Sequence, residues 1–555
     1  MDNQKSSNRI ARLIRPEVLN KAEPLTWSTG LGTDLWELIC AAITGDLDTA
    51  RRLLTKDPSL VRSSCDYRKA ITFAVQENQL EMVAFLLENG ANPVESGTPD
   101  SLITIASDRG YVEMQRLLET AVTGKKAGLP GGDTIAAVIK SRDVNALRQL
   151  LNESPEFLTA ADHDANLPIH WAVMTRQPGM IDELFSRGAD LNAQRIDGAR
   201  PIQLVNGDYN FRGWMKDFPV KPYEVLTHLR TKGAYIDICT AAAIGDIDRV
   251  KTLLDEDPSL ANRVSDYVTY YIGSGSPIKN AAARGHLEIV KLLLERGADP
   301  NLPEEGIAPR GHALHSAAYY GHIDIVKLLL EHGAYPNVEI ESSADTLSTA
   351  ISRDDKAIVE LLCSYGAARN VHLLAYYGDI ITAAAVFHAN PAKADDAAAL
   401  ENAAGEGHES FVRLMLRYQP DLAKRVAVGV RSQAPEETVR SATIRELLFA
   451  HRMDASRPNW LRITPLHKFA ERDDLENAVS FIAHGADLNA RDEELCSTPL
   501  GWAAKYGKLQ MAALLLQHGA KLNLPDDPHW ATPLSWATRR GHTEVAELLK
   551  LRGAE

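Results

Sequence analysis

The stretch "SPIKNAAARGHLEIVKLLLERGADPN", residues 276–301, decides the fold of this chain. Pro277 suits the first turn of a helix, and Gly285 suits the left-handed residue at which a helix ends. After Gly285, a second helix with one broad apolar face is predicted from Leu287, Ile289, Val290, Leu292, Leu293 and Leu294. Gly297 permits that helix to stop. Neither helix can bury its apolar side alone, so each pair has to stack on its neighbours.

The same pattern returns along the chain with a period of about 33 residues. Residues 312–337 read "HALHSAAYYGHIDIVKLLLEHGAYPN", and residues 498–523 read "TPLGWAAKYGKLQMAALLLQHGAKLN". These units resemble the ankyrin-repeat family, in which a TPLHLAA-like segment, a GH-like turn, an apolar helix and GADxN follow one another. The resemblance implies an all-α solenoid of helix-turn-helix units with finger loops, whose fingers and first helices form a concave binding face.

The residue before each second helix is glycine in the regular units and serves as a marker. Markers at 45, 78, 110, 142, 176, 221, 245, 285, 321, 354, 378, 407, 440, 473, 507 and 541 define sixteen candidate units. In seven of them the marker is another residue: Asn78, Arg142, Arg176, Lys221, Asp354, Arg440 or Asp473. Those units depend on their apolar pattern alone, and we expect about 12 to 16 units in all.

Two intervals between markers, 221 to 245 and 354 to 378, are too short to contain a finger. Directly after them stand the related segments "GDIDRVKTLLDEDPSL" at 245 and "GDIITAAAVFHANPAKA" at 378, and "GDLDTARRLLTKDPSL" at 45 matches both. This indicates duplicated modules and resembles long bacterial ankyrin proteins. The predicted divisions are an N-terminal segment 1–33, module 1 at 34–131, module 2 at 132–235 with a long insertion 205–220, module 3 at 236–370, module 4 at 371–456 and a C-terminal block 457–555.

Composition excludes several functional classes. Sixty Lys and Arg against 74 Asp and Glu give a net charge of −14, which disfavours binding to nucleic acid or an anionic membrane surface. The five cysteines form no CxxC pair, as expected of reduced thiols. The N-terminus has charges where a signal peptide needs an apolar stretch, and no segment approaches a membrane span. We therefore expect a cytoplasmic monomer without a cofactor.

The insertion "VNGDYNFRGWMKDFPVKPYE", residues 205–224, replaces the short turn between two helices. Loops of this length in a compact array are usually functional or disordered. Asp208, Tyr209, Arg212 and Trp214 offer a carboxylate, a phenol, a guanidinium and a stacking ring, a combination that suits a polar ring-shaped ligand. The alternative is that the insertion packs on its own repeat, with Arg212 paired to Asp208 or Asp217.

The next two fingers are also enlarged, and together with the insertion they predict one composite pocket between 205 and 315. The further ligand-binding candidates are Asp266, Tyr267, Tyr270, Tyr271, Arg310 and His312, with Tyr319 and Tyr320 on the adjoining first helix. Asp208, Glu304 and Glu305 are the candidates for an acid and a base, since no nucleotide, nucleophile-elbow or HExxH motif is present.

Two further surfaces follow from the repeat pattern. The residues before the marker glycines should line the concave face, unless their long side chains only cap the helix ends. They include Arg284, Tyr319, Tyr320, Tyr376, Tyr377, Arg472, Lys505, Tyr506, Arg539 and Arg540. Acidic fingers at Asp492, Glu493, Glu494, Asp526 and Asp527 beside the last cations form a second candidate groove, unless these charges are a solvated rim. Trp502 and Trp536 are expected in the core.

Histidines recur at the last position of the TPLH-like motif, at His170, His315 and His467, where the resemblance implies structural hydrogen bonds. His312 and His315 are three residues apart, but no third ligand stands at a fixed spacing, so no metal site is predicted.

Two functions remain open. The first is a scaffold that recognises a protein or peptide partner through its concave face without catalysis. The second is an enzyme or receptor, of the hydrolase or lyase kind, that acts on a polar, carbohydrate-like small molecule in the pocket between 205 and 315. The repeats favour the scaffold, whereas the clustering of the insertions favours the second function.

Overall fold

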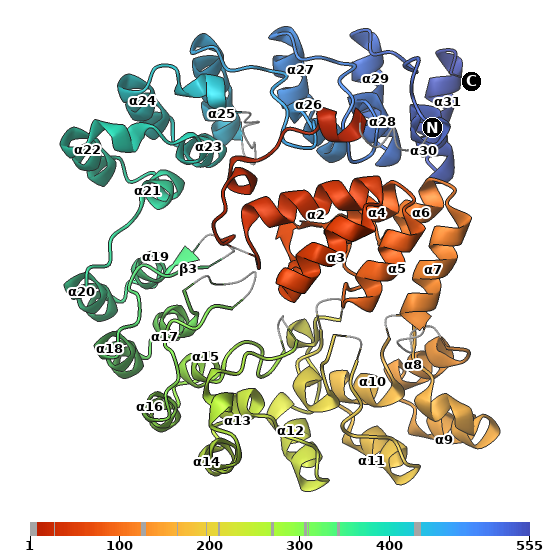
Figure 1. Ribbon diagram of the computed structural model, residues 1–555, viewed down its shortest axis with the longest axis vertical. Helices are drawn as coiled ribbons and strands as arrows, with labels where there is room; N and C mark the ends of the chain where they lie inside the picture. Colours follow the sequence, from red (N-terminus) through yellow and green to blue (C-terminus); the bar gives the residue numbers. More distant parts are fainter. Residues whose placement is uncertain are drawn as a thin grey trace.

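The computed structural model describes residues 8–26, 28–123, 129–163, 165–195, 197–208, 211–267, 271–304, 308, 310–340, 344–426 and 435–554. For Thr123, Trp214, Ala344 and residues 435–441 it describes the backbone only. Consecutive helix pairs stack into a solenoid that curls until its two ends lie against each other (Figure 1). The predicted all-α repeat solenoid is therefore confirmed.

Residues 8–123 form the N-terminal block. Residues 8–12 are helical and precede three helix pairs. The block contains η1 (Glu17–Asn20), α2 (Gly32–Thr44), α3 (Leu47–Lys56), η2 (Pro58–Arg62), α4 (Ala70–Gln76), α5 (Leu80–Glu88), α6 (Leu102–Asp108) and α7 (Val112–Thr123).

Residues 129–367 form the central block, which carries the long insertion and the enlarged fingers. Its elements are α8 (Gly132–Lys140), α9 (Val144–Glu153), η3 (Pro155–Thr159), α10 (Pro168–Met174), α11 (Pro178–Ser186), η4 (Pro201–Leu204), η5 (Gly213–Met215), α12 (Pro222–Thr231), α13 (Ile238–Ile244), α14 (Ile247–Glu256), η6 (Pro258–Asn262), α15 (Pro277–Ala283), α16 (Leu287–Glu295), α17 (Ala313–Tyr320), α18 (Ile323–Glu331), α19 (Thr346–Ser352) and α20 (Lys356–Ser364).

Residues 371–554 form the C-terminal block. It contains α21 (Val371–Tyr377), α22 (Ile380–Ala389), η7 (Pro391–Ala394), α23 (Ala397–Gly405), α24 (Glu409–Tyr418), η8 (Leu422–Arg425), α25 (Pro435–Ala450), α26 (Pro465–Arg472), α27 (Leu475–Ala483), α28 (Pro499–Lys505), α29 (Leu509–Gln517), η9 (His529–Ala531), α30 (Pro533–Arg539) and α31 (Thr543–Leu551).

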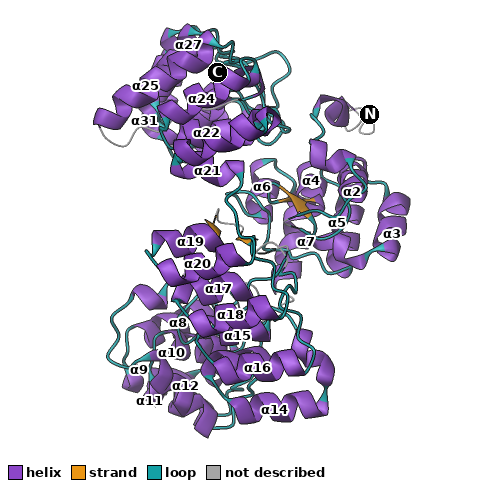
Figure 2. Ribbon diagram, turned by 90° about the vertical axis from the view of Figure 1, so that its left-hand side faces the viewer, coloured by secondary structure: helices purple, strands orange, loops and turns teal. Residues whose placement is uncertain are grey.

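Two fingers contain short antiparallel hairpins, which are the strands in Figure 2. β1 (Ser64–Cys65) pairs with β2 (Arg68–Lys69), and β3 (Glu339–Ile340) pairs with β4 (Ala344–Asp345). In the same view the helices gather into three groups, one for each block. The module boundaries drawn from the sequence stay a prediction.

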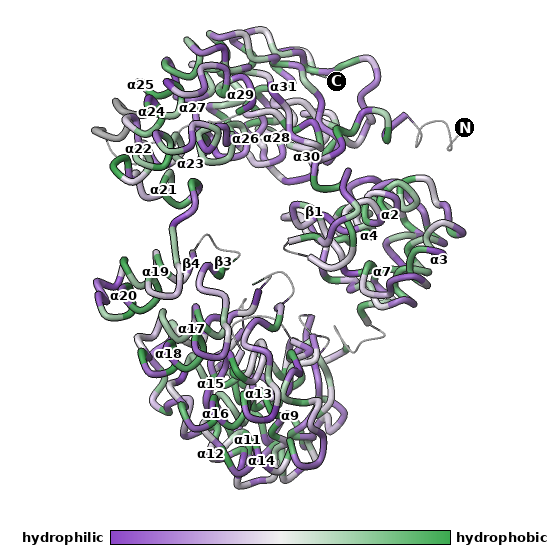
Figure 3. The backbone as a smooth tube through the Cα atoms, turned by 60° about the vertical axis from the view of Figure 1, so that its left-hand side comes forward, coloured by the Kyte–Doolittle hydropathy of each residue, from purple (hydrophilic) through white to green (hydrophobic). Residues whose placement is uncertain are grey.

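The core lies between the inner and outer helices of each stack. In the repeat at residues 276–301, Ile289, Val290 and Leu293 are buried as predicted. One continuous apolar cluster fills the central block from Ile135 to Ala367. A second cluster runs through both the N-terminal and the C-terminal block, and apolar segments alternate with polar ones along each (Figure 3). Among the described helices, none is both long and apolar enough to cross a membrane.

Five of the seven non-glycine markers keep the left-handed backbone geometry of the glycine markers, whereas Lys221 has an extended backbone with a φ of −85°. Fourteen of the sixteen markers fall between two α-helices; Lys221 follows η5, and Arg440 lies inside α25. The non-glycine markers Asn78, Arg142, Arg176, Asp354 and Asp473 all have positive φ angles, between 53° and 65°. The turn therefore demands the left-handed conformation, and these repeats adopt it in spite of the steric penalty on a side chain.

Asp473 gives a direct test of that penalty. Its φ is 61°, and its Oδ1 is buried without a hydrogen-bond partner in the described structure. We expect Asp473→Gly to stabilise the C-terminal block by about 1 kcal/mol, because glycine adopts this conformation freely. Asp473→Ala removes the carboxylate but keeps the steric penalty, so it should gain less. Differential scanning calorimetry of both variants measures the two contributions, and a glycine variant that melts lower than the parent contradicts this explanation.

Candidate functional site

Asp208 of the long insertion is buried and ion-paired. Its Oδ2 lies 2.6 Å from Nη1 of Arg195, and its Oδ1 accepts a hydrogen bond from the backbone N–H of Phe211. Arg195 belongs to the preceding finger and also contacts Asp197, at 3.0 Å. The insertion is thus fastened to its own repeat, as in the alternative interpretation, although the partner of Asp208 is Arg195. Arg212 itself is exposed.

Two tyrosines of the next finger are buried and use their hydroxyl groups inside the protein. Tyr267 donates to Oδ2 of Asp237 at 3.2 Å, and Tyr271 donates to Oδ2 of Asp197 at 2.7 Å. Burial, together with the charge of Asp237, raises the pKa of Tyr267 and keeps its hydroxyl neutral. These bonds attach the finger to the repeats before it, so both hydroxyls have structural partners.

Glu304 forms a third buried network. Its carboxylate accepts hydrogen bonds from the backbone N–H and the hydroxyl of Ser276, each at 3.0 Å, and lies 3.2 Å from Nδ1 of His312. Burial opposes ionisation of Glu304, but the bond to His312 and the charges of His312 and Lys279 outweigh it and lower its pKa. The carboxylate is therefore held ionised between two repeats.

His315, on α17, lies next to this network. Its Nε2 is 3.1 Å from Oγ1 of Thr349, and its Nδ1 has no hydrogen-bond partner among the described residues. Burial lowers the pKa of His315 to about 3, so the ring is neutral. The ring stacks against Tyr319, with centroids 6.2 Å apart. This histidine supports the position of an exposed tyrosine.

The remaining predicted site residues divide into exposed and undescribed ones. Asp266 is exposed and lies 2.5 Å from Arg263, and the guanidinium of the exposed Arg310 lies 4.5 Å from the ring centre of Tyr335. Tyr209, Tyr270 and Glu305 lie outside the described residues. For Trp214 the structure describes the backbone but not the side chain. The composite pocket stays a hypothesis.

Exposed aromatic side chains mark the ends of the first helices. Tyr319 and Tyr320 end α17, and Tyr376 and Tyr377 end α21 at the equivalent positions, with exposed fractions of 37% to 51%. Each pair packs edge to face, with centroids 4.9 Å and 5.1 Å apart. Arg353, at the equivalent position after α19, is also exposed. We call these five residues the tyrosine row.

The tyrosine row follows the inner side of the solenoid. In Figure 1, α17, α19 and α21 succeed one another on the inner side, with α18, α20 and α22 outside them. Two arginines lie beside the tyrosines. Nη2 of Arg353 lies close to Gly321, 3.6 Å from where a Cβ on that glycine would be, and the guanidinium of Arg369 is 5.0 Å from the ring centre of Tyr377. The sequence pattern had predicted the tyrosines but not these arginines.

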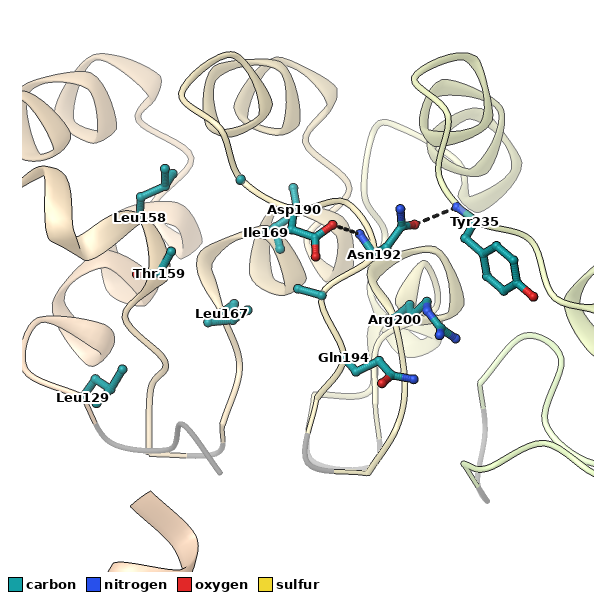
Figure 4. A pocket seen from close by; sticks show the side chains of 12 residues that line it. Leu129, Leu158, Thr159, Leu167, Ile169, Asp190, Asn192, Gln194, Arg200 and Tyr235 are labelled. Carbon is teal, nitrogen blue, oxygen red and sulfur yellow. Dashed lines mark hydrogen bonds between the residues drawn. The ribbon is translucent and has the colours of Figure 1, made fainter. Parts of the chain in front are cut away.

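An open trough of about 900 Å³ lies at the bases of the fingers in the central block. Figure 4 shows an apolar end, with Leu129, Leu158, Leu167 and Ile169, and a polar end, with Gln194, Arg200 and Tyr235. Asn192 fixes the wall between them, because its Oδ1 accepts a hydrogen bond from the backbone N–H of Tyr235 at 2.7 Å. Sequence analysis missed this trough because its lining comes from several separate repeats.

One group of potential metal ligands exists in the described part of the chain. Asp133, Asp162 and His163 place a ligand atom each within 4.8 Å of one another. Both carboxylate oxygens of Asp162 already accept hydrogen bonds, from the backbone N–H of Asn166 at 2.8 Å and from the indole of Trp171 at 2.6 Å. Asp162 thus shapes its finger, which explains its burial without a metal.

The second candidate groove, in the C-terminal block, is occupied by the N-terminal block. Glu493 lies 2.5 Å from Nε of Arg12, and Lys505 lies 2.6 Å from Asp100. Trp502 and Trp536 are fully buried, which confirms their predicted place in the core. Glu493, Glu494, Lys505, Arg539 and Arg540 therefore belong to a contact between the two ends of the chain. Asp526 and Asp527 instead interact with Arg491 of their own block, and Asp526 is exposed.

Comparisons with known proteins agree with the fold. The profile described as "Ankyrin repeats (3 copies)" matches residues 238–340, 281–372, 439–526 and 466–555. Among curated proteins, the chain is similar to a probable E3 ubiquitin-protein ligase, XBOS33, of Oryza sativa subsp. japonica, with 46% identity over 65 residues. It is also similar to the E3 ubiquitin-protein ligase XBAT33 of Arabidopsis thaliana, with 50% identity over 64 residues.

Each of these matches covers 12% of this chain and 12% of the relative. They are similarities over short stretches, and they leave the predicted resemblance to long bacterial proteins unconfirmed. The profile matches, the regular helix pairs and the left-handed turns at the marker positions all lead to one conclusion about the fold. This chain belongs to the ankyrin-repeat family.

Proposed function

We propose that the protein is a binding scaffold that recognises a protein or peptide partner through the tyrosine row. Ankyrin repeats serve as interaction modules, and in this chain the face used for binding carries exposed Tyr and Arg side chains. Such residues supply large rigid contact areas and planar hydrogen-bond donors, and they are enriched where binding energy concentrates. Four half-exposed tyrosines at equivalent positions of α17 and α21 are the observation that carries this proposal.

The chemistry of the row suggests what the partner offers. Tyrosine rings bury apolar side chains while their hydroxyls keep a polar contact, and the guanidinium of Arg353 pairs with carboxylates. The inner face near Tyr319 also has a rigid support, because His315 and Thr349 fix the ring that stacks against it. A segment with apolar and acidic side chains fits such a surface.

The alternative function, catalysis on a polar small molecule, has a weaker basis. Two of its three acid and base candidates, Asp208 and Glu304, are engaged in buried networks that join the fingers to their repeats. The plant relatives are named as ubiquitin-protein ligases, but the similarity covers only 12% of each of them and gives no support for ubiquitin ligation by this chain. Binding without catalysis needs no assumption beyond the exposed row.

The test is a paired substitution on the row. A partner captured from lysate and purified should bind the double variant Tyr319→Ala/Tyr376→Ala at least about tenfold more weakly, because centrally placed tyrosines typically contribute more than 1 kcal/mol each. Isothermal titration calorimetry measures the affinity. The melting temperature should fall only slightly, since the two side chains are 48% and 37% exposed.

Tyr365 supplies the matched control. It is 43% exposed and follows the outer helix α20, away from the row. Tyr365→Ala should leave the affinity unchanged. Equal loss in the double variant and the control would indicate a general effect of removing surface tyrosines, and unchanged binding by both would reject the row as the binding face.

A further inference from the structure

The ends of the first helices carry cations in the C-terminal block, at the positions where the central block exposes tyrosines. Lys505 ends α28, two residues before Gly507; Arg539 ends α30, and Arg540 follows it directly before Gly541. Because the ends of the first helices line the concave face of a repeat solenoid, these residues belong to a candidate binding face. The side chain of Lys505 is only 3% exposed, and those of Arg539 and Arg540 are 28% and 27% exposed.

The cover is an acidic surface of the N-terminal block around α6. Nζ of Lys505 lies 2.6 Å from Asp100, which is next to the first residues of α6. Nη2 of Arg540 lies 2.6 Å from Asp108, at the end of α6, and 3.4 Å from Asp100. Arg539 adds a contact of 3.3 Å to Asp108 and donates to its backbone oxygen. Three cations thus hold two carboxylates.

Charges of the opposite sense meet at the fingers. Glu493 and Glu494 lie in the finger before α28, and arginines of the N-terminal block contact both residues. Arg9 donates to the backbone oxygen of Glu493 at 2.6 Å, and Arg68 lies 2.6 Å from the carboxylate of Glu494. Arg109 donates to the backbone oxygen of Glu494 at 2.9 Å. Both faces therefore have complementary charge patterns.

Apolar contacts close the space between the ion pairs. Phe73 packs against Trp460, with ring centroids 5.8 Å apart, and the guanidinium of Arg109 lies 4.4 Å from the ring centre of Trp530. Between Ile105, Leu495 and their neighbours a cavity of only about 10 Å³ remains. That volume is at or below what one water molecule needs.

From these contacts we infer that the face formed by the ends of α28 and α30 is a second interaction surface, and that the N-terminal block is its built-in competitor. The partner it fits is an acidic helical segment that presents two carboxylates with the spacing of Asp100 and Asp108. Such a partner reaches Lys505, Arg539 and Arg540 only in molecules whose N-terminal block has moved away. The inference concerns a surface separate from the tyrosine row and does not depend on the proposed function.

An external partner and the N-terminal block compete for the same face at the ends of α28 and α30. The apparent affinity of a partner for the face falls in proportion to the fraction of open molecules. A change that weakens the internal contact without touching the three cations must therefore strengthen the binding of an external acidic segment. Charge reversal on the N-terminal side does this, because Asp100 and Asp108 lie on the competitor and not on the receiving face.

The test uses the full-length chain with Asp100→Lys/Asp108→Lys. Small-angle X-ray scattering should show a larger radius of gyration than the parent. A labelled synthetic peptide of residues 98–110, "TPDSLITIASDRG", should bind this variant at least tenfold more tightly than the parent in fluorescence anisotropy. The same peptide with Asn in place of both aspartates should lose that binding. Lys291→Glu, which affects an exposed pair with Glu288 in the central block, is the control and should change neither result.

A reciprocal variant separates opening from misfolding. Adding Lys505→Glu/Arg540→Glu to the reversed N-terminal block restores opposite charges across the contact, so the radius of gyration should return toward that of the parent. An unchanged radius in the first variant overturns the inference, as does a failure of the reciprocal variant to close. Equal peptide affinity in the open variant and the parent overturns it as well.

Discussion

Replacing Asp208 by Ala lowers the free energy of local unfolding of the central block by about 1 to 3 kcal/mol, the range found when a buried hydrogen-bonding group loses its partner. The side chain of Arg195 is only 9% exposed and would keep Asp197 as its remaining carboxylate. The backbone N–H of Phe211 would also lose its acceptor. The loss follows from a structural role, and no ligand is needed to observe it.

Hydrogen exchange measured by mass spectrometry reports this loss locally, which suits a long solenoid that does not unfold in one step. Peptides that cover residues 195–208 and 211–225 should exchange faster in the variant. Asp266→Ala is the matched control, because Asp266 and its partner Arg263 are both exposed and such pairs contribute little. Unchanged exchange in Asp208→Ala would show that the ion pair does not hold the insertion.

Acidification from pH 6.5 to 4 destabilises the protein by about 3 kcal/mol for each of two buried histidines, His170 and His467. Burial lowers the pKa of both side chains to about 4 from an ordinary value of 6.5. Between these values the unfolded state binds a proton that the folded state does not. Stability is therefore full above about pH 6.5 and falls as the pH drops toward 4.

The geometry explains why both rings stay neutral. Nδ1 of His170 accepts the backbone N–H of Leu167 at 3.0 Å, and Nδ1 of His467 accepts that of Thr464 at 3.1 Å. A proton on Nδ1 would place two donors face to face. Urea denaturation at several pH values measures the effect, and His518→Gln, on an exposed side chain, is the control. A stability that is flat between pH 6.5 and 4 contradicts the assignment.

The repeat architecture was predictable because each unit repeats its own local signals. Pro277 and Gly285 bound one helix, and the apolar positions after Gly285 define the next. The left-handed turn kept its place even at Arg142 and Asp354, where glycine is absent, because the stacking of neighbouring pairs imposes it. The local periodicity and its repetition were therefore sufficient to predict the fold.

The site was less predictable because it depends on contacts between distant residues. The position of Asp208 in an insertion suggested a free carboxylate, whereas its partner Arg195 lies one finger away, where periodicity gives no side-chain direction. The contact of Lys505 with Asp100 joins opposite ends of the chain, and only the curvature accumulated over all repeats brings them together. The exposed ends of α17 and α21 were predictable, since they follow the repeat.

The most direct test of the binding scaffold is photo-crosslinking in the source cells with benzoylphenylalanine placed at Tyr319, compared with the same residue at Tyr365. The scaffold predicts a discrete crosslinked protein from position 319 that is absent from position 365. Identical products from the two positions, or none from position 319, would contradict recognition of a protein partner through the tyrosine row.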